Sequence, residues 1–217
     1  MKNQEIIDYE NINSHFNKCI QLTYLYLATA DDNNIKIWNN NNSNQLEIEK
    51  KIIIGTKTSD LILVNNEYFI SSQPDKKIII IININTFEIS NTILNVDCTD
   101  SQNSLLSLKN FIIINCIKGI QLFFKKTREI TQNIQIFDNE LENKELYVYN
   151  NILYILQQHK VNSYLSNLKL SIFEFYDGFL EKIQEYEKTE IEDYNLKIIV
   201  MNEEQILLVG KYLYILK

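Results

Sequence analysis

Short runs of aliphatic, β-branched and aromatic residues recur along the whole chain, and each run is bounded by Asn, Asp, Ser or Gly. Such residues form half-buried strands, whereas Ala, the best helix former, is nearly absent. The pattern therefore predicts an all-β protein with many short strands. Asn pairs such as those at 33–34, 65–66 and 150–151 separate neighbouring runs, and we expect them to form the turns that Gly supplies elsewhere.

The apolar runs are also periodic. One type follows a turn residue, as in residues 32–38 and 75–81, and recurs at intervals of about 42–43 residues, with one interval of about 50. Its first apolar positions are Ile35, Ile78, Ile120, Leu170 and Leu213. A second type of run, which precedes the first, keeps the same period. Two series in step at this spacing indicate a β-propeller with four strands in each blade.

One segment, residues 27–39, resembles the end of a WD repeat, and through it the chain resembles the WD40-repeat family. Asp32 falls on the turn aspartate of the family and Trp38 on the Trp of its WD pair, with Asn39 in place of the final Asp. The second repeat keeps Asp75 but has Ile81 where the Trp would be. The remaining three repeats keep only the apolar pattern, so the resemblance is to a strongly diverged member.

The resemblance implies structural roles for a few polar residues. In the family, a His, the turn Asp, a strand Ser or Thr, and the Trp form a hydrogen-bonded set that stiffens a blade. The resemblance assigns these roles to His15, Asp32 and Trp38, and the turn role in the second repeat to Asp75. Ala30 stands at the usual hydroxyl position, so we expect an incomplete set. We expect Trp38 to be buried in the core.

The repeats predict a single domain, residues 1–217, that folds as a small propeller of about five four-stranded blades. The last repeat stops after its third strand, and residues 4–9 form an apolar run before the first blade. We expect residues 4–9 to pair with the strand near 214–217, which would close the ring and cover a sheet edge. The alternative is a partial propeller that a partner chain completes, in the manner of coat, nuclear-pore or ciliary-transport subunits.

Two segments depart from the regular period. The long interval falls at residues 157–166, which predicts an enlarged loop or an extended hairpin. Within it, His159, Lys160 and Tyr164 are candidates for a contact loop, although a tolerated insertion is the plainer interpretation. Residues 174–193 are rich in carboxylates and fit either a solvated outer strand or a short helix.

Composition narrows the class of protein. The chain has 217 residues, 45% of them hydrophobic, which excludes whole-chain disorder. Its net charge of −7 argues against direct nucleic-acid binding and against docking on anionic lipid. The N-terminal residues lack the apolar stretch of a signal peptide, and no apolar run approaches the length of a membrane helix, so we expect no membrane insertion. Three cysteines without paired spacing favour reduced thiols and a cytoplasmic or nuclear location.

The sequence offers little catalytic chemistry. It has no Gly-rich phosphate loop and no nucleophile elbow, and its two histidines, His15 and His159, are far apart. We therefore expect no cofactor, no metal site and no enzymatic activity. The resemblance implies a scaffold for contacts with other proteins in a multi-protein assembly. A propeller hydrolase or sugar-binding protein is the weaker alternative, because no repeated polar residue marks the start of the expected inner strands.

Overall fold

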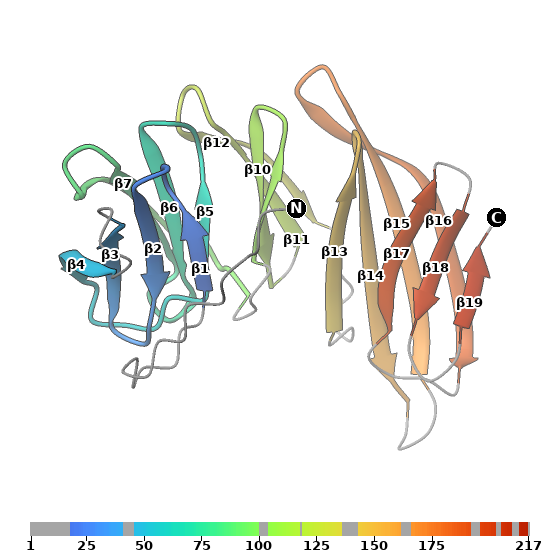
Figure 1. Ribbon diagram of the computed structural model, residues 1–217. Helices are drawn as coiled ribbons and strands as arrows, with labels where there is room; N and C mark the ends of the chain where they lie inside the picture. Colours follow the sequence, from blue (N-terminus) through green and yellow to red (C-terminus); the bar gives the residue numbers. More distant parts are fainter. Residues whose placement is uncertain are drawn as a thin grey trace, which may run out of the picture.

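The computed structural model describes residues 18–40, 46–99, 104–117, 119–135, 143–161, 166–191, 196–202, 205–209 and 213–216. Apart from a 3-10 turn at Pro74–Lys76, the regular structure of these residues is all β (Figure 1). The all-β prediction is confirmed. The strands form five antiparallel sheets, in each of which consecutive strands of the chain lie side by side.

The strands of each sheet are consecutive. The first sheet contains β1 (Lys18–Gln21), β2 (Tyr26–Ala30), β3 (Asn34–Asn39) and β4 (Glu47–Ile53). The second contains β5 (Asp60–Leu63), β6 (Tyr68–Gln73), β7 (Ile78–Asn83) and β8 (Glu88–Leu94). The third contains β9 (Leu105–Leu108), β10 (Phe111–Cys116), β11 (Gly119–Phe124) and β12 (Glu129–Gln135).

The last two sheets are unequal in size. The fourth contains β13 (Asn143–Tyr149), β14 (Ile152–Lys160), β15 (Ser166–Tyr176) and β16 (Phe179–Ile191). The fifth has three described strands, β17 (Lys197–Asn202), β18 (Gln205–Val209) and β19 (Leu213–Leu216). The periodic anchors all fall on third strands: Ile35, Ile78, Ile120, Leu170 and Leu213 lie in β3, β7, β11, β15 and β19.

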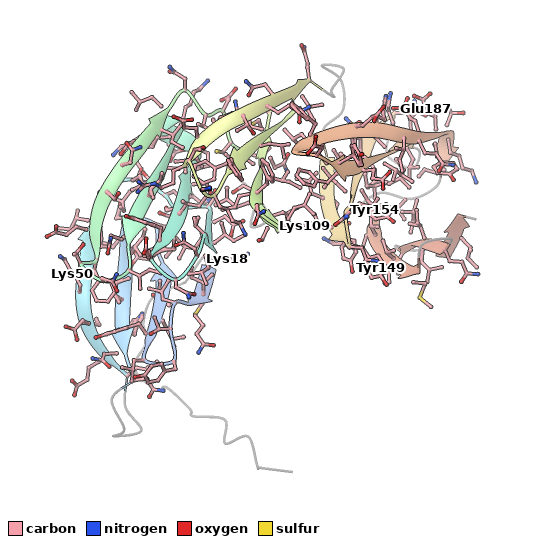
Figure 2. All side chains as sticks on the ribbon, turned by 90° about the horizontal axis from the view of Figure 1, so that it is seen from above. Lys18, Lys50, Lys109, Tyr149, Tyr154 and Glu187 are labelled. Carbon is pink, nitrogen blue, oxygen red and sulfur yellow. The ribbon has the colours of Figure 1, made fainter. Side chains whose placement is uncertain are left out.

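The five sheets follow one another around an arc, seen from above in Figure 2. The first strand of each sheet, which we call its inner strand, contacts the inner strand of the next, from β1 to β5, β9, β13 and β17. Lys18 in β1 lies on the inner side of the arc, and Lys50 in β4 and Glu187 in β16 lie on the outer side (Figure 2). The first and fifth sheets stand apart at its two ends. The predicted closing strand, residues 4–9, lies outside the described residues.

Four apolar clusters fill the spaces between successive sheets. The run in β7 shows how one strand serves two of them, since Ile80 and Ile82 pack toward the first sheet and Ile79 and Ile81 toward the third. Alternate residues of a strand point to opposite faces, so a continuous apolar run fits a strand that is buried on both sides. Among the described residues, the second, third and fourth sheets are covered on both faces in this way, whereas the first and fifth are covered on one face.

Short polar residues shape the hairpins. The Oδ1 atom of Asn65 accepts the backbone N–H groups of Glu67 and Tyr68 in the β5–β6 turn. Asn150, in the β13–β14 turn, has a φ of 53°. The prediction that Asn residues form these turns is therefore confirmed. In the described chain, seven residues other than Gly have positive φ: Lys77, Phe87, Asn95, Lys109, Arg128, Asn150 and Asp177.

The same irregularity recurs in all four four-stranded sheets. The register between the third and fourth strands shifts at Ile37/Trp38, Ile81/Ile82, Leu122/Phe123 and Ile172/Phe173. Such a shift is a β-bulge, which bends the strand and increases its twist. The bulges thus repeat with the blades, although their side chains share no common sequence.

The structure shows which secondary structure the two irregular segments, residues 157–166 and 174–193, adopt where they are described. Residues 157–160 belong to β14 and pair with β15 up to the match of Lys160 with Ser166, so the extended hairpin is confirmed and these residues are part of the sheet. Shortening at this point would therefore remove paired strand and not exposed loop. The short helix considered for residues 174–193 is wrong for Phe179–Ile191, which form the outer strand β16. Leu180, Ile183 and Tyr186 have a spacing that a helix could also use, and the pairing with β15 makes the segment a strand.

A close backbone approach in the third sheet gives a test of this architecture. A Cβ atom on Gly119 would collide with the carbonyl oxygen of Ile134 in the paired strand β12. We expect Gly119→Ala to lower the free energy of unfolding by about 1–3 kcal/mol, because β12 must shift to admit the methyl group. Glu129→Ala, at an exposed position of β12, should change it by less than about 0.5 kcal/mol. Chemical denaturation measures both, and equal effects would mean that the strands are not this close.

Candidate functional site

Trp38 is held by a hydroxyl from the neighbouring strand. Its indole Nε1–H donates to Oγ1 of Thr29 over 2.8 Å. The expectation that the hydroxyl is missing is therefore wrong, because Thr29, and not Ala30, faces the indole. Trp38 is half-buried and not fully buried as expected. It lies on the face of the first sheet that points away from the second, and no other sheet of the described residues packs against that face.

The turn between β2 and β3 is closed by Asp31. Its Oδ1 atom accepts the backbone N–H groups of Asn33 and Asn34, and its Oδ2 atom lies 3.1 Å from Nζ of Lys36. Partial burial raises the pKa of Asp31, but these hydrogen bonds outweigh it and leave the pKa below its usual value. The turn role assigned to Asp32 is thus carried by the preceding residue, and Asp32 itself is exposed.

Asp60 joins three sheets at the inner side of the arc. Its fully buried carboxylate lies 3.1 Å from Nζ of Lys18 in the first sheet. It accepts the backbone N–H of Leu61 over 2.9 Å, and that of Leu105 in the third sheet over 3.0 Å. Burial raises the pKa of Asp60 in spite of these favourable partners. The carboxylate therefore satisfies a buried N–H of the next inner strand and neutralises a lysine.

Three buried serines extend this polar cluster. The hydroxyl of Ser72 is 2.8 Å from those of Ser59 and Ser104, and Ser59 and Ser104 are 3.3 Å apart. Ser72 lies in β6, and Ser59 and Ser104 directly precede the inner strands of the second and third sheets, β5 and β9. Polar residues therefore do stand at the start of two inner strands, contrary to the sequence analysis. We call this group with Asp60 and Lys18 the inner polar cluster.

A similar contact joins the fourth and fifth sheets. Oε2 of Glu145, in β13, accepts the backbone N–H of Ile198 in β17 over 3.0 Å. Oε1 of Gln158 accepts the N–H of Leu196 over the same distance, and Lys197 pairs with Glu145. At Asp60 and at Glu145, a side chain of one sheet accepts a backbone N–H from the inner strand of the next sheet. Gln158 does the same for the residue directly before that strand. These bonds connect successive sheets where no strand pairing can.

Those sequence-predicted residues that the structure describes do not form one site. His15 and Tyr164 lie outside the described residues. Asp75 is exposed in the 3-10 turn before β7. His159 and Lys160 lie at the end of β14, in the fourth sheet. Asp75 and Trp38 are on separate sheets, so each can act only within its own blade.

Sequence reasoning missed the residues that connect the sheets. Asp60, Ser104 and Glu145 each end a short polar stretch directly before an apolar run, and such boundaries occur throughout the chain. One signal was present, since Asp60 opens the run Leu61–Val64 directly after Thr58 and Ser59. A carboxylate at the start of a strand that is buried on both faces must have partners.

Within the described part of the chain, the first and fifth sheets each have one face against which no other sheet packs. On the fifth sheet, Ile198 and Val200 pack toward the fourth, so Ile199 between them points the other way, and Met201 lies at the bulge that follows Val200. Met201 is 58% exposed, and Ile215 in β19, on the same face as Ile199, is 56% exposed. On the first sheet, the open face carries Leu27, Trp38, Ile48 and Ile53, of which Ile48 and Ile53 are exposed. We call these surfaces the two end faces.

Other types of site receive little support from the described residues. Within them, no three His, Cys, Asp or Glu side chains gather as a metal site requires. In the same part of the chain, no helix has the length and hydropathy needed to span a bilayer.

Comparison with known proteins supports the fold. No family model and no curated protein sequence matches the chain. Among solved structures, hydrazine synthase of Kuenenia stuttgartiensis superposes with a TM-score of 0.58 at 12% identity over 85% of this chain. A chain of the mitotic checkpoint complex gives 0.57 at 11% identity over 87%. The protein has a β-propeller-like fold. The propeller chain spans 58% of the length of each of these two neighbours.

The inner polar cluster can be tested through Asp60. We expect Asp60→Ala to lower the free energy of unfolding by about 2–4 kcal/mol, because it leaves the Leu105 N–H buried without its acceptor. Glu88→Ala removes a carboxylate from an exposed pair with Lys50 and should cost less than about 1 kcal/mol. Urea denaturation of both variants measures the difference. A small effect at Asp60 would show that the cluster does not connect the sheets.

The Trp38–Thr29 bond can be isolated by a double-mutant cycle. Trp38→Phe and Thr29→Val each remove one partner of the hydrogen bond and keep most of the apolar volume. We expect a coupling energy of about 1 kcal/mol between the two substitutions. Additive effects in thermal or urea unfolding would mean that Thr29 is not the partner of the indole.

Proposed function

We propose that this protein is a non-catalytic, WD40-like interaction scaffold, and that its open arc is completed by β-structure from another protein. The observation that carries the proposal is the pair of end faces. The second, third and fourth sheets are buried on both faces, whereas the first and fifth sheets are covered on one. The end faces mark where the stacking of sheets can continue.

The end face of the fifth sheet has the chemistry of the buried faces. Ile199 pairs with Leu207, and Leu207 with Ile215, so one apolar row crosses all three strands. The covered face of the same sheet carries a comparable row through Ile198 and Leu208. Burial of apolar surface contributes about 25 cal/mol per Å². A partner that packs a sheet here would therefore gain free energy from apolar burial, as each internal sheet does.

A sheet fits this surface better than a helix does. The row on the fifth sheet lies on a twisted antiparallel surface, and the four internal junctions pack sheet against sheet throughout the described chain. An added blade would also bring its inner strand beside β17, as β13 already lies beside it. The proposed occupant is therefore a β-sheet with one apolar face and an inner strand of its own.

The comparisons are consistent with this role. Both solved neighbours extend well beyond the part that this chain matches. One of them is a chain of the mitotic checkpoint complex. The WD-type features of the first sheet, with Trp38 bonded to Thr29, support a diverged WD40-like blade.

The non-catalytic part of the proposal rests on how the buried carboxylate is used. Asp60 has a lysine and two backbone N–H groups as partners, so its oxygen atoms serve to connect sheets. The acidic net charge favours protein partners over nucleic acids. We place the scaffold in the cytoplasm or the nucleus, as the cysteine content favours reducing conditions.

The test compares the proteins that copurify from the native cell with the intact protein and with end-face variants. Met201→Lys and Ile215→Lys place charge on the two most exposed apolar side chains described in the fifth sheet. Leu94→Lys places the same charge on an exposed leucine at the end of β8 and serves as the control. We expect a stoichiometric partner that binds the intact and control proteins and is lost at least about 10-fold from both end-face variants.

Retention of the partner by the end-face variants would contradict the proposal. Self-association that depends on Met201 and Ile215 would also contradict it and would identify a second copy as the occupant. A variant that lacks residues 1–9 is tested in the same experiment. If residues 4–9 pair with the last strand and close the ring, this variant cannot close it. Closure by the chain's own N-terminal segment would be favoured if the deletion lowers the unfolding midpoint and if no partner copurifies with the intact protein.

A further inference from the structure

Cys98 and Cys116 face each other across an isolated antiparallel bridge. The backbone N–H of Thr99 donates to the carbonyl of Asn115, and that of Ile117 donates to the carbonyl of Asp97, each over 2.9 Å. The two bonds flank the cysteines, which therefore occupy the non-hydrogen-bonded position of the bridge. Residues at such a position have Cα atoms about 4.5 Å apart and side chains on the same face.

This geometry suits a covalent link between the two sulfur atoms. A disulfide requires Cα atoms about 4.4–6.8 Å apart, so the backbone hardly needs to move. Both side chains belong to the same apolar cluster, between the second and third sheets. The neighbouring Cys116 is also one of the causes, after burial, that raise the pKa of the Cys98 thiol. The third cysteine, Cys19, is exposed on the first sheet and takes no part in this bridge.

One of the two thiols borders a cavity. A cavity of about 320 Å³ opens between the segment after β8 and the third sheet, and Cys116 lines it together with Asn95, Asp97 and Gln121. Its volume exceeds that of a water molecule about ten-fold, so a small oxidant fits inside. Cys98 is not among the residues that line the cavity and is 2% exposed. Cys116 is therefore the thiol that a reagent meets first.

We propose that Cys98 and Cys116 are a site of reversible oxidation, at which a hydroperoxide converts the two thiols into an intrachain disulfide. The Cys116 thiolate attacks the outer peroxide oxygen, the O–O bond breaks, and a sulfenic acid and water or an alcohol form. The sulfur of Cys98 then attacks the sulfenic sulfur, the S–S bond forms, and water leaves with the proton of Cys98. Two thiols are oxidised and one peroxide is reduced.

The surroundings slow the second step, in which the sulfur of Cys98 attacks. Burial keeps the pKa of Cys98 well above its usual value, and the thiolate is the form that reacts. The product would connect the segment between β8 and β9 to the end of β10. That segment is the connection between the second and third sheets, so oxidation would fix how these two sheets are joined. A reductant would restore the two thiols.

The experiment uses the full chain with Cys19→Ser, which removes the exposed thiol and its intermolecular disulfides. The protein is treated under native conditions with hydrogen peroxide, denatured, alkylated and digested for mass spectrometry. We expect a peptide pair joined through Cys98 and Cys116, with neither sulfur alkylated, and a higher unfolding midpoint that returns to its original value with dithiothreitol. Adding Cys98→Ser should abolish the midpoint shift and leave a Cys116 sulfenic acid that dimedone traps.

Alkylation of both thiols after peroxide treatment would overturn the proposal. So would oxidation of Cys116 to a sulfinic acid while Cys98 remains a thiol, because the pair would then fail to close. A disulfide with an unchanged midpoint would show that the link forms without joining the two sheets more tightly, which contradicts the structural consequence. The primary measurement needs neither cysteine of the pair to be replaced, so it does not depend on the folding of the Cys98→Ser variant.

Discussion

A sheet that is apolar on both faces needs a neighbour on each side, and this requirement governs the molecule. The five sheets meet it by stacking in chain order, with the apolar clusters between them. Stacking in an arc satisfies every internal sheet and leaves the requirement open at the two ends. The same burial that stabilises the fold therefore creates the surfaces to which we assign its function.

Apolar stacking alone does not set how one sheet meets the next. The inner strands lie side by side, and side-chain acceptors satisfy donors that strand pairing leaves over, as Asp60 does for Leu105 and Glu145 for Ile198. Burying a carboxylate is costly unless it is paired, so such contacts tolerate few alternative arrangements. Directional polar contacts thus sit on the inner side of the arc, and nondirectional apolar contacts occupy the remaining space between the sheets.

Periodicity allowed the sequence to predict the strands well, since the anchors from Ile35 to Leu213 all lie in third strands. Local pattern was less reliable where pairing dominates, as in β16, where a helical stripe became a strand. The hydrogen-bond partners could not be predicted, because they depend on register. A shift of one residue separates Thr29 from Ala30 and Asp31 from Asp32, and it changes which side chain faces Trp38 or closes the turn. The contacts of Asp60 join residues about one repeat apart in three successive sheets, and no other inner strand begins with Asp, so the pattern of repeats does not mark it.

The bulge shared by the four larger sheets bears on solubility. It lies where the third strand meets the outermost one, whose far side offers unpaired N–H and C=O groups to any other chain. Extra twist at this point makes the rim a poor template for edge-to-edge growth, and charged residues such as Lys51 and Glu187 on these strands add repulsion. A chain this rich in isoleucine and tyrosine is otherwise at risk of forming cross-β aggregates. The repeated bulge protects each rim separately, so association can be confined to the ends of the arc.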